Sequence, residues 1–189
     1  MMSTGRPLAR YASRWNKAAC ATRSVVRGLA PPLGEPRFTN DIDIIADFNP
    51  ETLDLFLASL PETFFAERDD ARKALRLGRS FNVIYVPMAF KFDFFPAGAF
   101  PIGGEELDRA VWLDASGLSD APAPFVTAED ILLDKLHWFQ AGGQVSEVQW
   151  RDVQGVVRGR GALLDRKYLE ESAAKLGIRK LLDRALGER

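Results

Sequence analysis

The sequence predicts an α+β fold, in which a small mixed β-sheet comes first and a helical region follows. Two patterns indicate this order. Between residues 41 and 95, apolar and polar side chains alternate in short segments with the two-residue period of strands. After residue 126, helix-capping residues and glycine stops recur at the spacing of successive helices. With 189 residues, of which 47% are apolar, the chain can bury the core of one globular domain.

The sheet-forming part is expected to hold helices between its strands. The stretch from Asp41 to Ala46 alternates acidic and β-branched side chains, which predicts a strand. Pro50 opens and Pro61 closes a predicted helix, and Gly78 ends a second one because glycine tolerates left-handed geometry. The expected elements are strands 41–46, 81–86, 89–95, 111–114 and 124–126, and helices 51–60 and 69–77.

Three side chains that can cap helices mark the predicted starts of helices in the last third of the chain. Thr127, Ser146 and Asp165 each carry an oxygen that can accept a hydrogen bond from a first-turn N–H group. The first two are followed three residues later by Asp and Gln, which resembles a capping box. The expected helices run from residue 127 to about 140, and over 147–157, 166–176 and 178–186.

The first 34 residues differ in charge from the rest. They carry six basic side chains and no Asp or Glu, whereas the remaining residues carry 19 basic and 26 acidic ones, a net charge of −7. An acidic body with a basic leader is not typical of a broad nucleic-acid-binding surface. Residues 1–33 are interpreted as an atypical leader: a disordered tail or weak helix, an organellar transit peptide, or a diverged or mistranslated replacement for the start of the fold. Within it, only Ser24-Val25-Val26 looks like a strand.

The numbers of cysteine and histidine residues limit the kinds of catalytic and metal site that the chain can form. One cysteine (Cys20) and one histidine (His137) exclude an internal disulfide and a Cys- or His-rich metal site, and they make Ser-His-Asp chemistry a poor fit. Any catalysis must therefore rest on carboxylates, lysines, arginines and backbone groups. No apolar run approaches the roughly 18 residues of a membrane-spanning helix. A cytoplasmic protein with no membrane partner is expected.

Three aspartates are the strongest candidates for chemistry. Asp41 and Asp43 leave the same face of their predicted strand and repel each other unless a cation lies between them. Asp93 shares a face with Lys91 in a strand otherwise built of phenylalanine. If the two strands are neighbours, the three carboxylates converge and can hold two Mg²⁺ ions. The alternatives are an exposed acidic pair at a strand end, and an edge strand whose Lys91 and Asp93 face water.

These residues carry a resemblance to a known family. Residues 34–45, Gly-Glu-Pro-Arg-Phe-Thr-Asn-Asp-Ile-Asp-Ile-Ile, resemble the core motif of bacterial nucleotidyltransferase-like proteins. These proteins belong to the polymerase-β-type nucleotidyltransferase superfamily, near the AbiEii-type abortive-infection toxins. The similarity continues through residues 80–84, 91–93, 130–138, 142–143, 146–147 and 149–152, and it spans roughly residues 34–185. It implies a nucleotidyltransferase-type mixed sheet flanked by helices at residues 34–126, followed by a helical region at 127–189.

The resemblance also implies an activity: Mg²⁺-dependent transfer of a nucleoside monophosphate from an NTP to a hydroxyl group on RNA, protein or a small molecule. Asp41 and Asp43 match the metal-binding pair, and Asp93 matches the third carboxylate, which ligates metal and helps to deprotonate the acceptor. Lys135 and Asp152 match positions near the nucleotide, and the Lys135 ammonium suits a phosphate. An antitoxin-like protein partner is a further expectation.

One segment departs from the family pattern. The superfamily grips the triphosphate with a Gly-Ser or Gly-Gly turn after its first strand. Gly28 lies at about the right distance from Asp41, but Leu29 replaces the small polar partner, and a Pro-Pro pair follows at residues 31–32. Arg37 is a second phosphate candidate, with an ion pair to Glu35 or Asp41 as its alternative. The altered turn favours a second hypothesis, a catalytically degenerate nucleotidyltransferase fold that binds a partner.

Overall fold

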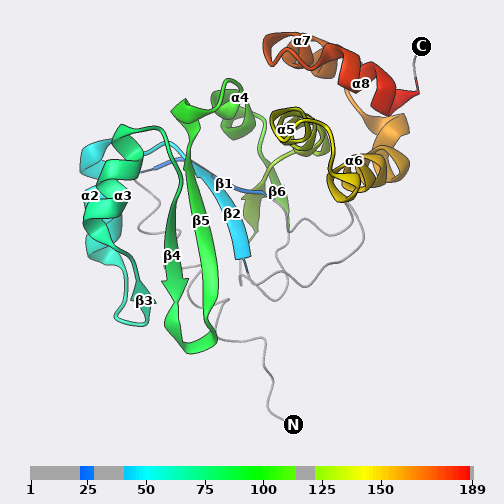
Figure 1. Ribbon diagram of the computed structural model, residues 1–189. Helices are drawn as coiled ribbons and strands as arrows, with labels where there is room; N and C mark the ends of the chain where they lie inside the picture. The colour runs from blue at the N-terminus through cyan, green and yellow to red at the C-terminus, as the bar shows by residue number, and fades with distance from the viewer. Residues whose placement is uncertain (1–21, 28–40, 114–121, 188–189) are drawn as a thin grey trace. The chain divides into compact units, whose positions relative to one another are not determined.

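The computed structural model describes residues 22–27, 41–113 and 122–187 (Figure 1). These residues belong to two compact units. The first holds the described residues up to Val126, and the second begins at Thr127. In the described residues, no helix combines the length and the apolar character that a membrane span requires.

The first unit is built on a mixed sheet, as predicted. Its seven described strands have the order β3-β4-β5-β2-β1-β7-β6. β2 pairs in parallel with β5 and antiparallel with β1, and β1 pairs in parallel with β7. The strands are β1 (Ser24–Arg27), β2 (Asp41–Ala46), β3 (Phe64–Phe65), β4 (Phe81–Tyr85), β5 (Phe90–Pro96), β6 (Val111–Leu113) and β7 (Ala123–Phe125). Four residues of the expected leader thus form β1, an inner strand of the sheet.

Helices α2 (Pro50–Ser59) and α3 (Arg68–Arg76) pack on one face of this sheet (Figure 1). Asn49 caps α2 by accepting a hydrogen bond from the Thr52 N–H group at 2.8 Å, and the Thr52 hydroxyl accepts one in return from the Asn49 N–H group. Pro50 stands in the first turn, where its missing N–H group has no consequence. Gly78, with φ of 60°, follows α3 as the sequence predicts.

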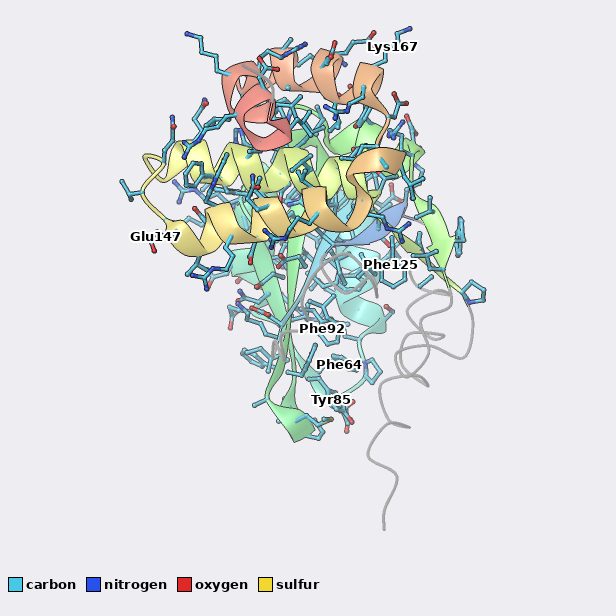
Figure 2. The ribbon with its side chains drawn as sticks, turned by 90° about the vertical axis from the view of Figure 1, so that its right-hand side faces the viewer. Phe64, Tyr85, Phe92, Phe125, Glu147 and Lys167 are labelled. Carbon is cyan, nitrogen blue, oxygen red and sulfur yellow. The ribbon has the colours of Figure 1, made fainter. Side chains whose placement is uncertain are left out.

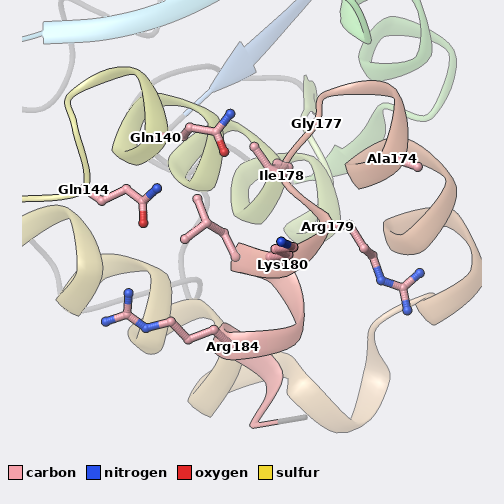
Figure 3. A pocket seen from close by; sticks show the side chains of 9 residues that line it. Gln140, Gln144, Ala174, Gly177, Ile178, Arg179, Lys180 and Arg184 are labelled. Carbon is pink, nitrogen blue, oxygen red and sulfur yellow. The ribbon is translucent and has the colours of Figure 1, made fainter. Parts of the chain in front are cut away.

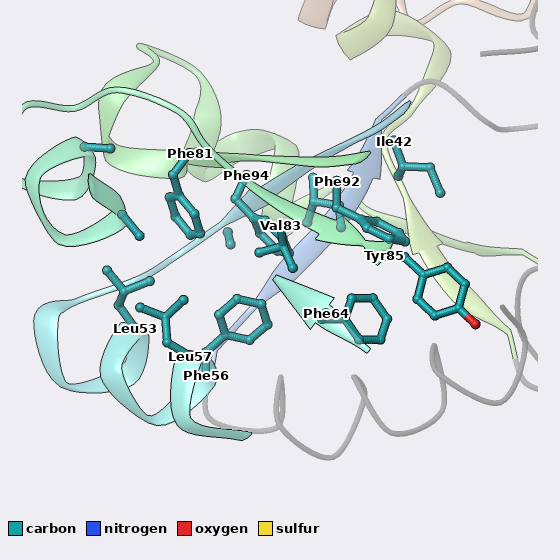
Figure 4. Close-up of a cluster of buried hydrophobic side chains, with 14 residues drawn as sticks. Ile42, Leu53, Phe56, Leu57, Phe64, Phe81, Val83, Tyr85, Phe92 and Phe94 are labelled. Atoms are coloured by element: carbon teal, nitrogen blue, oxygen red, sulfur yellow. The ribbon is translucent and has the colours of Figure 1, made fainter. Parts of the chain in front are cut away.

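A phenylalanine-rich core lies between this face and the two helices (Figure 4). Ile42 and Ile44 of β2 are buried there, together with Phe81 and Phe94, whose rings stack at 5.3 Å between centroids. Figure 2 shows further aromatic side chains of the same cluster from a second direction. Because side chains alternate along a strand, burying the isoleucines sends Asp41 and Asp43 to the opposite face.

That opposite face carries α4 (Gly103–Asp108), a helix that the sequence did not predict. Glu106 of α4 is fully buried, and both of its carboxylate oxygens accept hydrogen bonds from Arg27 Nη2 at 3.0 Å. A Cβ atom on Gly103 would lie 2.2 Å from the Ala97 carbonyl oxygen, so only glycine fits at the start of this helix.

The second unit consists of helices in its described part: α5 (Ala128–Ala141), α6 (Glu147–Arg160), α7 (Arg166–Lys175) and α8 (Arg179–Leu186). Thr127, Ser146 and Asp165 cap the first three through their side chains, as predicted. The Asp130 carboxylate differs from the expected capping box, because it is fully buried and accepts hydrogen bonds from the Thr127 and Tyr168 hydroxyls. α6 ends at Arg160, three residues beyond its predicted end.

Candidate functional site

A row of polar residues crosses the sheet face opposite the phenylalanine-rich core. Asp43 on β2 lies opposite Arg27 on β1 and opposite Asp93 on β5, and Asp93 in turn lies opposite Asn82 on β4. Residues opposite one another in paired strands point to the same face. Asp41 shares that face, two residues before Asp43. The strand of Asp93 therefore does lie beside the strand of Asp41 and Asp43, which is the condition for the three carboxylates to converge.

The alternative in which Asp93 stands on a solvent-facing edge strand is wrong. β5 is an inner strand between β4 and β2, and the Asp93 side chain is only 14% exposed. A carboxylate at this depth requires partners, since burial without them is costly. Lys91 Nζ lies 2.6 Å from Asp93 Oδ2, and Asn82 Nδ2 donates to Asp93 Oδ1 at 2.9 Å. Both oxygens of Asp93 are thus engaged.

Lys91 is the cation paired with Asp93 on this face. It lies opposite Asp41 in the β2–β5 register and forms the ion pair with Asp93. The hydrogen bond to Asp93 raises the pKa of Lys91 above its usual value; burial opposes the rise, and the charges of Asp93, Asp41 and Asp43 add to it. The ammonium therefore lies in the combined field of all three carboxylates. The sequence placed Lys91 and Asp93 on one face but assigned the lysine no role.

Lys91 occupies the carboxylate that the predicted metal site would need, Asp93. Within the described ranges, no group of three or more Asp, Glu, His or Cys side chains is gathered so that it could hold a metal ion. In this arrangement Asp93 is bound by Lys91 and Asn82. Carboxylate oxygens are nevertheless the ligands that Mg²⁺ prefers, and the charges of three carboxylates act on the Lys91 ammonium. A divalent cation at this face would have to replace the Lys91 ammonium at Asp93.

Arg27 fixes the end of β1 beside the carboxylates. The residue is 8% exposed, its guanidinium is held by Glu106, and its Cζ lies 5.7 Å and 5.6 Å from the ring centroids of Phe95 and Phe100. The sequence did not indicate this pair, because its members are separated by 79 residues. Gly28, the predicted phosphate-binding glycine that follows Arg27, and Arg37 both lie outside the described residues.

Two further predicted site residues lie in the helical unit. Lys135 on α5 and Asp152 on α6 are paired, with 3.2 Å between Nζ and Oδ2, and each side chain is 34% exposed. Asp134, the residue before Lys135, accepts a hydrogen bond at 3.1 Å from Nε1 of Trp138, which lies one helical turn further along α5. Lys135 is accessible to a phosphate, but its ammonium already has a carboxylate partner. A phosphate bound there must share or displace Asp152.

Comparisons with known proteins concern the fold. No protein-family model matches the chain, and no curated protein matches it in sequence. An antigenic nucleotidyltransferase-like protein from Paracoccidioides brasiliensis is similar in structure, with a TM-score of 0.53 and 15% identity over 94% of this chain and 90% of that one. The antibiotic-resistance factor ANT(2'')-Ia gives a TM-score of 0.46 at 15% identity, over 93% and 90% of the two chains. In fold, the chain is similar to nucleotidyltransferase-like proteins, as its motifs predict.

Proposed function

We propose that this protein transfers a nucleoside monophosphate from an NTP to a hydroxyl group of an acceptor, breaking the α–β phosphate bond and releasing pyrophosphate. The observation that carries the proposal is the parallel register of β2 and β5, which sets Asp43 opposite Asp93 with Asp41 on the same face. The similarity in fold to a nucleotidyltransferase-like protein supports it. Neighbouring carboxylates on one rigid sheet suit a reaction in which a triphosphate must be bound and a hydroxyl deprotonated.

In this proposal Asp41, Asp43 and Asp93 hold Mg²⁺, which when bound supplies the positive charge that neutralises the triphosphate. Asp93 also takes up the proton of the acceptor hydroxyl, at the oxygen that Lys91 now occupies. Asn82 fixes the orientation of Asp93 through the other oxygen. Lys91 would have to leave Asp93 for a cation to be held there. Lys135, in the helical unit, is a separate candidate for a phosphate contact, because its ammonium is a point charge.

The experiment is nucleotide labelling of candidate acceptors. The protein is incubated with Mg²⁺, each of the four α-labelled NTPs, and RNA, protein or small hydroxyl compounds. Wild type is compared with Asp43→Asn, and with Asp69→Asn as a control on the exposed start of α3. Labelling is expected in wild type and in the control and is expected to vanish in Asp43→Asn. Labelling that survives in Asp43→Asn removes the carboxylate row from the reaction.

A second candidate function is a binding role without catalysis, for example with an antitoxin-like protein. The observation that favours it is the Lys91–Asp93 ion pair, which satisfies the third carboxylate without a metal. Calorimetry with Mg²⁺ and ATP separates the two candidates. Metal-dependent nucleotide binding in the micromolar range supports the transferase, and absence of such binding supports the degenerate site.

A further inference from the structure

The helical unit holds a cavity of about 630 Å³ beside α8, lined also by the C-terminal end of α5 and the α7–α8 connection (Figure 3). Among the described residues that line it, every charged side chain is cationic: Arg179, Lys180 and Arg184. The side-chain amides of Gln140 and Gln144 line it as well. The cavity wall is therefore rich in hydrogen-bond donors and carries positive charge.

The three cations are not equivalent. Arg179 is neutralised, because its Nε lies 2.8 Å from Asp183 and its Nη1 lies 3.3 Å from Glu170. Its side chain also points away from the two glutamines in Figure 3. Lys180 and Arg184 are exposed, and neither forms an ion pair within the described part of the chain. The positive charge available to a ligand comes from these two residues.

Arg184 is held in position by an aromatic ring. Its Cζ lies 4.1 Å from the ring centroid of Trp150, and Trp150 in turn packs on Phe139 with 5.3 Å between centroids. A guanidinium stacked on a ring keeps its N–H donors in its own plane, where they can bind an anion. Less side-chain entropy is then lost when a ligand binds. A flexible surface arginine lacks this advantage.

A second cavity of about 390 Å³ adjoins the first, since Gln144 and Arg184 line both. Trp150 and Arg151 line this second cavity, and Glu147 is its one acidic residue among those described. Arg184 thus lies between the two cavities, and cationic side chains line each of them. The space and the charge extend beyond what a single small anion needs.

We propose that these adjoining cavities form a phosphate-binding site. Arg184 and Lys180 are its charged donors, and the amides of Gln140 and Gln144 are its neutral donors. Phosphate oxygens accept several hydrogen bonds at once, and arginine matches their geometry better than any other side chain. The phosphate belongs either to a free polyphosphate or to the backbone of a bound RNA. The site is separate from the predicted Lys135–Asp152 pair and does not depend on the proposed transferase activity.

The test is a calorimetric titration of the full chain with tripolyphosphate, at low salt and in EDTA so that the carboxylate row plays no part. The variants are Arg184→Gln, Lys180→Gln and Gln140→Leu. The last removes a donor without changing the charge. The control is Lys167→Gln on α7, whose side chain is 86% exposed and which removes the same charge outside the cavity.

Affinity is expected to fall about tenfold in Arg184→Gln and in Lys180→Gln, and about threefold in Gln140→Leu, with no change in Lys167→Gln. Thermal unfolding of each variant shows whether it is folded. If Arg184→Gln has a folding defect, Lys180→Gln decides the outcome, because it changes an exposed side chain. Absence of binding to wild type overturns the proposal. So does an equal loss in Lys167→Gln, which indicates diffuse attraction.

The source of the phosphate is decided by repeating the series with a short single-stranded RNA of about ten nucleotides. If the same variants weaken RNA binding, the site takes a phosphodiester backbone. If only tripolyphosphate binding responds, the site takes a free polyphosphate. Asp43→Asn is titrated in parallel. Wild-type tripolyphosphate binding in that variant, whatever its labelling activity, separates this site from the proposed transferase site.

Discussion

Lys91→Met is the most informative single change in the first unit. The substitution keeps most of the apolar stem and removes the ammonium that lies 2.6 Å from Asp93. Lys91 is 42% exposed and Asp93 only 14%, so the pair is stronger than a surface ion pair of less than about 1 kcal/mol. A hydrogen bond to a charged group contributes roughly 1.5–3 kcal/mol. After allowance for the exposed lysine, a loss of about 1–2 kcal/mol in the free energy of unfolding is expected without metal.

If a cation must displace Lys91, the free energy of the Lys91–Asp93 ion pair also weakens metal binding by the same amount. Removing the competitor then raises the affinity for a divalent ion by the free energy of the lost pair, which corresponds to about 5–30-fold. Mn²⁺ binding is followed by electron paramagnetic resonance, and metal-free stability by urea unfolding. The matched control is Lys73→Met, an exposed lysine on α3. Unchanged or weaker Mn²⁺ binding in Lys91→Met refutes the competition, and no binding to wild type or variant refutes the metal site itself.

The pH dependence of this pair has a definite sign. A raised lysine pKa means that the stabilisation is fully present below the usual lysine pKa and is lost as the pH rises through the raised one. The difference in unfolding free energy between wild type and Lys91→Met is therefore expected to be constant near neutral pH. It is expected to shrink only above the usual lysine value of 10.5. A difference that already falls between neutral pH and that value contradicts this assignment of the pair.

Two further predictions concern α4 and its attachment to β1. Glu106→Gln removes the buried charge that binds the Arg27 guanidinium, and urea unfolding is expected to show a loss of about 3 kcal/mol. Asp108→Asn, which breaks an exposed pair on the same helix, is expected to change stability by less than about 1 kcal/mol, and equal effects contradict the buried-pair argument. Gly103→Ala is expected to cost about 2 kcal/mol or more in the same assay, since its Cβ meets a backbone carbonyl at 2.2 Å. Gly104→Ala, with open space around its Cβ, is the control, and a wild-type stability for Gly103→Ala refutes the close approach.

The elements that the sequence predicted well are those whose signals are local. Pro50 and Gly78 bound their helices through their own backbone preferences, and Thr127 caps α5 through an N–H group three residues away. α4 escaped prediction because its helix has six residues and depends on Glu106 reaching Arg27, far away in the sequence. The helix propensities of neighbouring residues do not predict a contact between residues far apart in the sequence.

The same distinction between local and long-range signals applies to the candidate site. Alternation alone places Asp41 with Asp43, and Lys91 with Asp93, on common faces. Which strands are neighbours depends on strand order, and the structure sets β5 beside β2 in parallel with Asp43 opposite Asp93. Which carboxylate Lys91 binds depends on the conformations of the side chains on these paired strands. The alternation of residues along a strand does not predict those conformations.

Lys91 therefore connects the two candidate functions. An ammonium among three carboxylates stabilises the face without metal, as a degenerate binding fold requires. In the proposed transferase, a divalent cation would take the place of the same ammonium. The ion pair with Asp93 opposes metal binding, and a triphosphate supplies further oxygen ligands for that metal. Nucleotide and metal added together are thus expected to bind where metal alone binds weakly, and that cooperativity is the property that distinguishes a working site from a degenerate one.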